Sequence, residues 1–161
     1  PDTGKASAMV GGNLLTALRT AAASSVSIKH LARKDAKVIG MIGAGHQATF
    51  QLRAALEQRD FEKVIGWNFH PEMLPNIEKV ATEAGLPFEA VELDGMTEAD
   101  VIISITSAFA PSLMADHVAP GRGQFARLVG HGDGLRGFDA GERVGQEGHS
   151  GMLRKLIWAP V

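Results

Sequence analysis

One short segment constrains the fold more than any other: residues 37–48, which read KVIGMIGAGHQA. The segment opens with an apolar, β-branched run of strand length, and residues 49–56 continue with a helical pattern of apolar side chains. Between the two stands the pattern Gly-x-Gly-x-x-Ala, at Gly43, Gly45 and Ala48. The order strand, glycine turn, helix predicts the first βα unit of a doubly wound parallel sheet.

Each small residue of this turn can be assigned a physical role. Gly43 allows a tight reversal, Gly45 removes the Cβ that would keep a pyrophosphate off the backbone, and Ala48 lets the helix pack closely on the strand. A helix beginning near Gly45 or His46 would present free N–H groups and a positive dipole end. The turn therefore predicts a dinucleotide site. The alternative is a tight βα turn with no ligand.

The following residues continue the same pattern. A second strand over residues 63–67 completes a βαβ unit of about 30 residues, and a helix over 71–84 is expected to stop at Gly85. A short strand over 88–93 precedes an apolar strand over 101–106, which is typical of a parallel sheet covered on both faces. We therefore expect an α/β fold with a Rossmann-type, doubly wound parallel sheet.

Residues 5–10 alternate weakly and predict a strand, and residues 14–33 predict a helix rich in small side chains. Such a helix lets another backbone pack closely on it. Arg19 in this helix is either a solvated side chain or a clamp for a carboxylate or phosphate. Its larger apolar residues and one of its alanines fall near one face: Leu15, Leu18, Ala22, Val26 and Leu31.

The residues at the ends of the second and fourth strands indicate which cofactor could bind and where it would lie. An NAD site usually carries Asp or Glu at the tip of the second strand, whereas Asn68 stands near that tip here, and no Arg is present to bind a 2′-phosphate. The cofactor is therefore written as NAD or NADP. Thr106 and Ser107 follow the apolar strand, where a cofactor ribose or nicotinamide would pass. The alternative for this hydroxyl pair is capping of the next segment.

Composition excludes several classes of protein. A chain of 161 residues with 45% hydrophobic residues and a net charge of −2 is globular and does not favour a nucleic acid partner. The absence of cysteine excludes disulfides and thiolate catalysis. Without an apolar run of membrane-spanning length or a signal peptide, we expect a cytoplasmic protein with no membrane partner. The spacing of His131, Asp133, Asp139 and His149 matches no metal-ligand pattern, so no metal site is predicted.

Residues 122–161 differ in character from the rest of the chain. Ten of the 19 glycines fall within residues 121–161, and residues 122–150 show neither a strand nor a helix period. Only residues 152–158 look able to pack. We leave this tail unassigned. Because the chain also begins at Pro1 without Met, we interpret it as a piece of a longer protein.

Several segments together resemble the ornithine cyclodeaminase and mu-crystallin family. They are LTALRTAAAS at residues 15–24, the turn at 43–48, and EADVI at 98–102 followed by Thr106 and Ser107. The resemblance covers about residues 1–121. Residues 11–15 and 63–68 are most similar to the iminosuccinate reductase branch. The family's catalytic aspartate segment has no convincing counterpart after residue 121, which suggests a frameshift, and Asp133 is not assigned as catalytic.

The resemblance implies a homodimer with a Rossmann domain and a substrate and dimerisation domain. Residues 1–35 would then be a remnant of the second domain with a connecting helix, and residues 36–121 the NAD(P)-binding domain. Arg19 would contact the substrate carboxylate, and Thr20 would help to hold the cofactor. The remaining implied cofactor contacts are the pyrophosphate loop of Gly43, Ala44, Gly45, His46 and Gln47, with Asn68 near the adenosine ribose and Thr106 and Ser107 near the nicotinamide.

The implied activity is that of an NAD(P)-dependent amino or imino acid oxidoreductase. It would either reduce an imine, as from iminosuccinate to aspartate, or cyclise ornithine with loss of ammonia. The alternative is a catalytically inactive nucleotide- or ligand-binding module of mu-crystallin type, which the missing aspartate segment favours for this chain. A third possibility is an unstable fragment with four strands and an exposed sheet edge.

Overall fold

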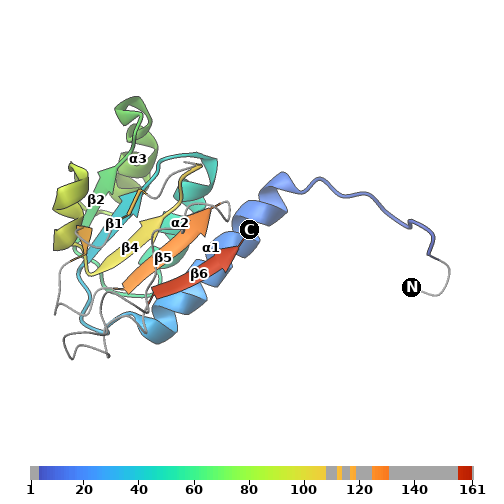
Figure 1. The fold of residues 1–161 in the computed structure, drawn as a ribbon, viewed down its shortest axis with the longest axis horizontal. Coiled ribbons are helices and arrows are strands. Elements are labelled where there is room, and N and C mark those ends of the chain that lie inside the picture. The colour runs from blue at the N-terminus through green and yellow to red at the C-terminus, as the bar shows by residue number, and fades with distance from the viewer. Residues whose placement is uncertain (1–3, 108–111, 114–116, 119–124, 131–155, 161) are drawn as a thin grey trace.

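The computed structural model describes residues 4–107, 112–113, 117–118, 125–130 and 156–160. Its centre is one parallel sheet, and residues 4–12 extend away from it (Figure 1). The sheet has six strands in the order β3-β2-β1-β4-β5-β6. Their bounds are β1 Val38–Ile42, β2 Lys63–Trp67, β3 Phe88–Ala90, β4 Val101–Ser104, β5 Phe125–Gly130 and β6 Leu156–Pro160.

Every neighbouring pair of strands is parallel. Strand β1 pairs with β2 on one side and with β4 on the other. The strand order therefore reverses between β1 and β4, and the chain leaves these two strands in opposite directions. Such a switch point opens a crevice outside the carboxyl ends of the strands. The expected doubly wound sheet is confirmed.

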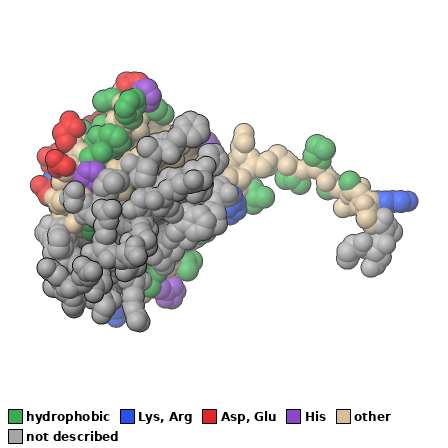
Figure 2. All heavy atoms as spheres, in the orientation of Figure 1, with side chains coloured by type: hydrophobic (Ala, Val, Ile, Leu, Met, Phe, Trp, Pro, Cys, Tyr) green, Lys and Arg blue, Asp and Glu red, His purple; other side chains and the backbone are tan. Residues whose placement is uncertain are grey.

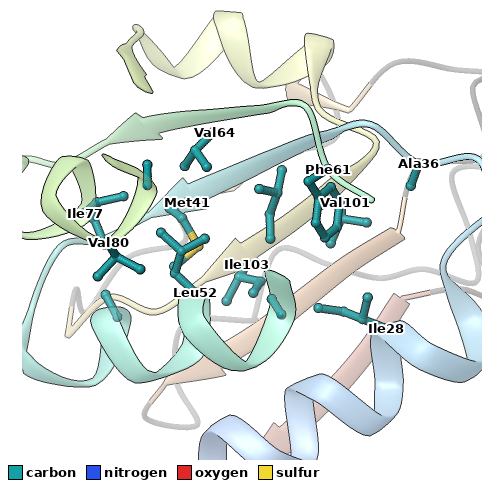
Figure 3. Packing of buried hydrophobic residues seen from close by; sticks show 14 of the residues in the cluster. Ile28, Ala36, Met41, Leu52, Phe61, Val64, Ile77, Val80, Val101 and Ile103 are labelled. Carbon is teal, nitrogen blue, oxygen red and sulfur yellow. The ribbon is translucent and has the colours of Figure 1, made fainter. Parts of the chain in front are cut away.

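Two apolar layers cover the sheet because successive side chains of a buried strand point to opposite faces. Ile39 and Met41 of β1 pack with α2 (His46–Leu56) and α3 (Pro75–Glu83) on one face (Figure 3). Ile42 packs on the other face with Met96, from the 3₁₀ helix η2 (Leu93–Glu98). A second 3₁₀ helix, η1 (Pro71–Met73), links β2 to α3. Gly85 ends the α3 segment with φ +75°.

Helix α1 (Asn13–Leu31) packs against α2 through its small residues. Its buried side chains are Ala17, Thr20, Ala21, Ser24 and Ile28, and Ser25 donates a hydrogen bond to the carbonyl of Ala54 at 3.0 Å. The face with the larger apolar residues points the other way: Leu15, Leu18 and Val26 are each more than half exposed. Small side chains permit the closer approach of two helix backbones, so they decide which face is buried.

Arg59 holds the end of α1. Its guanidinium donates to the carbonyls of Ile28, Lys29 and Ala32 through Nη2, and to that of Arg33 through Nε, at 2.8–3.0 Å. The last carbonyls of a helix have no partner within the helix, and a planar guanidinium can satisfy several of them at once. The contact ties the end of α1 to the loop after α2.

Asp100 holds the beginnings of β1 and β4 together. Its carboxylate accepts hydrogen bonds from the backbone N–H of Lys37 at 2.8 Å and of Val38 at 3.1 Å, and it pairs with Arg33. Burial by itself raises the pKa of this carboxyl. The two N–H groups and the guanidinium outweigh that effect and hold the pKa of Asp100 below its ordinary value. The residue therefore acts at the amino ends of the strands, away from the crevice.

Two expectations differ from the structure. The strand predicted over residues 5–10 was wrong: residues 4–12 form no element and are exposed, and Met9 is fully so. Figure 2 shows apolar side chains along this extended segment. The tail, for which no element was assigned, contributes β5 and β6, so the sheet has six strands rather than four. Residues 125–130 read FARLVG, where the charged Arg127 interrupts the apolar run, so neither alternation nor a continuous apolar run marks this strand in the sequence.

Candidate dinucleotide-binding site

A cavity of about 340 Å³ opens where β1, β2 and β4 end. It therefore lies at the switch point of the sheet, where open α/β sheets bind ligands. Six predicted site residues line it: Gly43, Ala44, Gly45, Asn68, Thr106 and Ser107. The other lining residues are Trp67, Phe69, His70, Met73, Ile105 and Ser112.

The two glycines of the turn have different structural demands. Gly43 has φ +104°, and a Cβ at this position would stand 2.3 Å from the carbonyl oxygen of Ile105, so only glycine fits. Gly45 has an ordinary φ of −74°, and within the described part of the chain nothing beyond its own neighbours in sequence lies within 4 Å of the place where its Cβ would be. The fold therefore requires Gly43, whereas the bare backbone of Gly45 leaves open space for a ligand.

The turn presents unused hydrogen-bond donors. Within the described residues, no acceptor meets the backbone N–H of Ala44, Gly45, His46 or Gln47. His46 and Gln47 begin α2, whose first turn contains no acidic side chain to occupy those donors. Free N–H groups at a helix start, together with the positive end of the helix dipole, bind phosphate oxygens. These residues therefore fit a pyrophosphate.

The loop after β2 forms another wall of the cavity. The amide Nδ2 of Asn68 donates to the carbonyl of His70 at 2.8 Å, which leaves Oδ1 as an acceptor. Nδ1 of His70 lies 3.4 Å from the carboxylate of Glu72. Phe69 is 78% exposed and meets His70 edge to face. Among the described lining residues there is no Lys, Arg, Asp or Glu, so only His70 can carry a charge there.

Thr106 and Ser107 follow β4 on the other side of the cavity. The hydroxyls of Thr106 and Ser112 lie 3.5 Å apart. The backbone N–H of Ile105 donates to the carbonyl of Ile42 at 2.8 Å, which fixes the start of this loop against the end of β1. Thr106 and Ser107 therefore lie across the cavity from the loop that carries Asn68.

The structure does not bring every expected site residue to the cavity wall. His46 and Gln47 lie just behind it, in the first turn of α2, and the Oε1 of Gln47 is buried without a partner in the described chain. Arg19 and Thr20 lie on α1 and do not line the cavity. Arg19 is exposed, whereas Thr20 is buried and donates to the carbonyl of Thr16 at 2.7 Å.

Half of the residues that line the cavity were not predicted as site residues from the sequence. Trp67, Phe69 and His70 could have been found from the rule that ligands lie beyond the carboxyl ends of strands, which had already selected Asn68. Met73 and Ser112 carry no such signal, since their loops reach the cavity only through the tertiary fold.

The sequence profile of the Ornithine cyclodeaminase/mu-crystallin family matches residues 1–132. The chain belongs to this family. The profile extends past residue 121, where the resemblance appeared to end from the motifs alone, and it includes strand β5. The glycine turn and the cavity described above both lie within the part that the family profile covers.

Known members of the family are similar over the same region. The iminosuccinate reductase of Paracoccus denitrificans is 71% identical over 119 residues, which cover 73% of this chain and 37% of that protein. The rat ketimine reductase mu-crystallin is 36% identical over 123 residues, which cover 75% of this chain and 38% of that protein. The chain thus spans less than two fifths of the length of these relatives.

Solved structures of family members agree with the fold. The Paracoccus iminosuccinate reductase in complex with NAD+ superposes with a TM-score of 0.69 over 80% of this chain and 39% of that one, at 65% identity. The Thermococcus litoralis Delta(1)-pyrroline-2-carboxylate reductase in complex with NADH and L-proline gives a TM-score of 0.72 over 81% of this chain and 41% of that one, at 35% identity. The Rossmann-type fold is therefore shown.

In the described part of the chain, no cluster of three His, Asp or Glu residues could hold a metal ion. His131, Asp133, Asp139 and His149 lie outside the described residues. None of the described helices is both long enough and apolar enough to cross a bilayer.

Proposed function

We propose that this chain is the cofactor-binding part of an NAD(P)-dependent amino or imino acid oxidoreductase. The observation that carries the proposal is the set of unused N–H donors around Gly45, beside a cavity at the switch point of the sheet. When bound, the nicotinamide ring would supply or accept a hydride. The N–H groups of residues 44–47 would hold the pyrophosphate, and Thr106 and Ser107 would lie along the nicotinamide half.

We further propose that the chain prefers NAD(H) to NADP(H). The free Oδ1 of Asn68 can accept a hydrogen bond from a ribose hydroxyl, whereas a 2′-phosphate would need a cation. No Lys or Arg lines the described cavity, and the nearby Glu72 adds negative charge beside His70. The two structures compared above were solved with NAD+ and with NADH, which supports the same choice.

The substrate class follows from family membership and from Arg19. An exposed guanidinium can bind a carboxylate through two parallel hydrogen bonds. We propose that Arg19 and Thr20 serve the substrate and the cofactor respectively once the rest of the family fold is present. A relative 71% identical in sequence is an iminosuccinate reductase, which supports imine reduction, as from iminosuccinate to aspartate, over cyclisation of ornithine.

The arrangement in a longer protein is part of the proposal. The exposed apolar residues Leu14, Leu15 and Leu18 of α1 are suited to packing against another domain or subunit, which supports a homodimer. Residues 1–35 would then connect the Rossmann domain to a substrate and dimerisation domain. The proposed chemistry uses the nicotinamide pool of the cytoplasm, where we place the protein.

A second candidate is a binding module without turnover. The observation that favours it is the cavity wall itself, in which His70 is the sole ionisable side chain among the described residues and lies on the adenosine side. Among the described residues, the cavity wall on the side of Thr106 and Ser107 therefore carries no ionisable side chain. A chain with this wall can hold a nucleotide, but it would need a further group to protonate a substrate.

Titration of the chain with NADH and with NADPH, followed by nicotinamide fluorescence and thermal shift, tests both candidates. We expect saturable binding with preference for NADH, and loss of binding in Gly45→Asp, whose carboxylate would occupy the open phosphate space.

Oxidation of NADH in the presence of iminosuccinate would support the oxidoreductase, and that turnover should fall in Arg19→Ala while NADH binding stays. Binding without turnover would favour the module only where it persists with the rest of the family fold present. A folded chain that binds neither nucleotide would refute both.

A further inference from the structure

The glycine turn is held by contacts at three points. The N–H of Gly43 donates to the carbonyl of Trp67 at 2.9 Å, and the N–H of Ala48 donates to the carbonyl of Gly45 at 3.0 Å. Between them, the side-chain Nδ2 of Asn76 donates to the carbonyl of Ala44 at 3.1 Å. The first two contacts are local to the βαβ backbone. The third comes from a side chain of α3, which follows the βαβ unit in the chain.

Asn76 does not serve its own helix. It is the second residue of α3, but the N-cap of this helix is Leu74 and no side chain caps it. Asparagine is a poor helix former because its amide competes for nearby backbone groups. Here the amide reaches a carbonyl 32 residues earlier in the chain. The contact therefore serves the turn rather than the helix.

The contact has a defined effect on the next peptide group. A trans peptide is planar, so its C=O and N–H point in opposite directions. Asn76 fixes the carbonyl of Ala44 and thereby directs the N–H of Gly45 away from α3. Gly45 has no Cβ, and among the described residues nothing beyond its chain neighbours lies within 4 Å of where one would stand, so no side chain at this position holds the peptide in place. Gly45 lines the cavity, and its N–H has no acceptor among the described residues.

We propose that Asn76 is a positioning residue that orients the Ala44–Gly45 peptide so that its N–H group can receive a pyrophosphate oxygen. The inference rests on the proposed function, since it gives a role in phosphate binding to a residue that does not line the cavity. A peptide group oriented before the ligand arrives costs less to order on binding. Loss of the contact should therefore weaken every ligand that carries the pyrophosphate and should leave adenosine unaffected.

The test compares three variants of the full 161-residue chain. Asn76→Leu keeps the branching and the number of side-chain heavy atoms and improves helix propensity, but it removes the donor. Asn76→Gln keeps the amide on a longer side chain. Thr82→Leu is the matched control, since Thr82 is exposed and lies further along the same helix. The ligands are NADH, ADP and adenosine. The backbone amide resonance of Gly45 is followed by NMR in the free protein, and urea unfolding reports stability.

We expect Asn76→Leu to bind NADH and ADP roughly tenfold more weakly, as for one lost hydrogen bond, with adenosine binding and urea midpoint unchanged. The Gly45 amide resonance should move, Asn76→Gln should recover part of the affinity, and Thr82→Leu should match wild type. Wild-type affinity for NADH and ADP in Asn76→Leu would overturn the proposal, as would equal weakening of adenosine. A wild-type chain that binds neither NADH nor ADP refutes the proposed function, and the Gly45 resonance then decides: a shift supports the orienting contact, and no shift overturns it.

Discussion

Replacing each glycine of the turn by alanine should separate folding from ligand binding. Gly43→Ala places a Cβ 2.3 Å from the carbonyl oxygen of Ile105 and asks an L-residue to adopt φ +104°. The new Cβ of Gly45→Ala meets no described residue other than its chain neighbours within 4 Å, and the position keeps an ordinary φ of −74°. The same substitution two residues apart should therefore act on different properties, and each variant serves as the control for the other.

The size of the Gly43 effect follows from the contacts that must yield. A non-glycine residue at such a φ costs about 1–3 kcal/mol. Relief of the clash requires the end of β4 to move away from β1. That movement loses the hydrogen bond from Ile105 to Ile42 at 2.8 Å, which is worth about 1 kcal/mol. We expect the free energy of unfolding to fall by about 2–4 kcal/mol, a large part of the total stability of a small domain.

Gly45→Ala should cost much less stability. Its position is the N-cap of α2, where alanine is less favourable than glycine by about 0.5–1 kcal/mol. NADH affinity, however, should fall because the new methyl group stands where the phosphates approach. Urea unfolding followed by circular dichroism measures the first quantity, and nicotinamide fluorescence measures the second. Equal losses of stability in the two variants, or a Gly43→Ala chain as stable as wild type, would refute the reasoning.

Two further predictions concern the contacts that hold α1 and β1. Asp100→Asn should lower the free energy of unfolding at pH 7 by about 2 kcal/mol, since a carboxylate that accepts two N–H groups and pairs with Arg33 becomes neutral. Because the pKa of Asp100 is lowered by folding, its contribution is present above the unfolded pKa near 3.9 and is lost as pH falls through the folded pKa. The gap between wild type and variant should therefore narrow as the pH falls below about 4, and a gap of unchanged size from neutral to strongly acid pH in urea unfolding would contradict this assignment. Arg59→Ala should destabilise by about 2–3 kcal/mol and Arg59→Lys by less, because the ammonium cannot reach four carbonyls of α1 and its following loop at once. Thermal unfolding measures both variants, and a lysine variant no more stable than the alanine variant would show that the hydrogen-bond fork is not what matters.

Local chemistry makes part of this protein readable from its sequence. The run of β1, the glycine turn and α2 were predicted at nearly their observed positions, because strand burial, a reversal at Gly43 and a helix start at His46 all depend on residues within about one turn of each other. Strand β2 was predicted with its observed bounds for the same reason. The same turn predicted the dinucleotide site, and the cavity beside Gly43, Ala44 and Gly45 agrees with that expectation.

Tertiary contacts decided the rest. Residues 5–10 alternate like a strand, but none of the described strands pairs with them, so alternation alone did not make them one. In α1 the bulkier stripe of Leu15 and Leu18 lies outside, because the closeness of α2 favours the alanine face. Strand β5 has no readable period, yet it pairs with β4 along most of its length.

The candidate site shows the same division. The turn at residues 43–48 carries in its own sequence the geometry that we propose for phosphate binding, since a positive φ and bare backbone are local properties of glycine. The walls supplied by Met73 and Ser112, and the hydrogen bond from Asn76 to Ala44, join segments about 30 or more residues apart. No local pattern marks these residues, because their positions depend on how the helices and loops pack against a sheet that forms only when the whole domain folds.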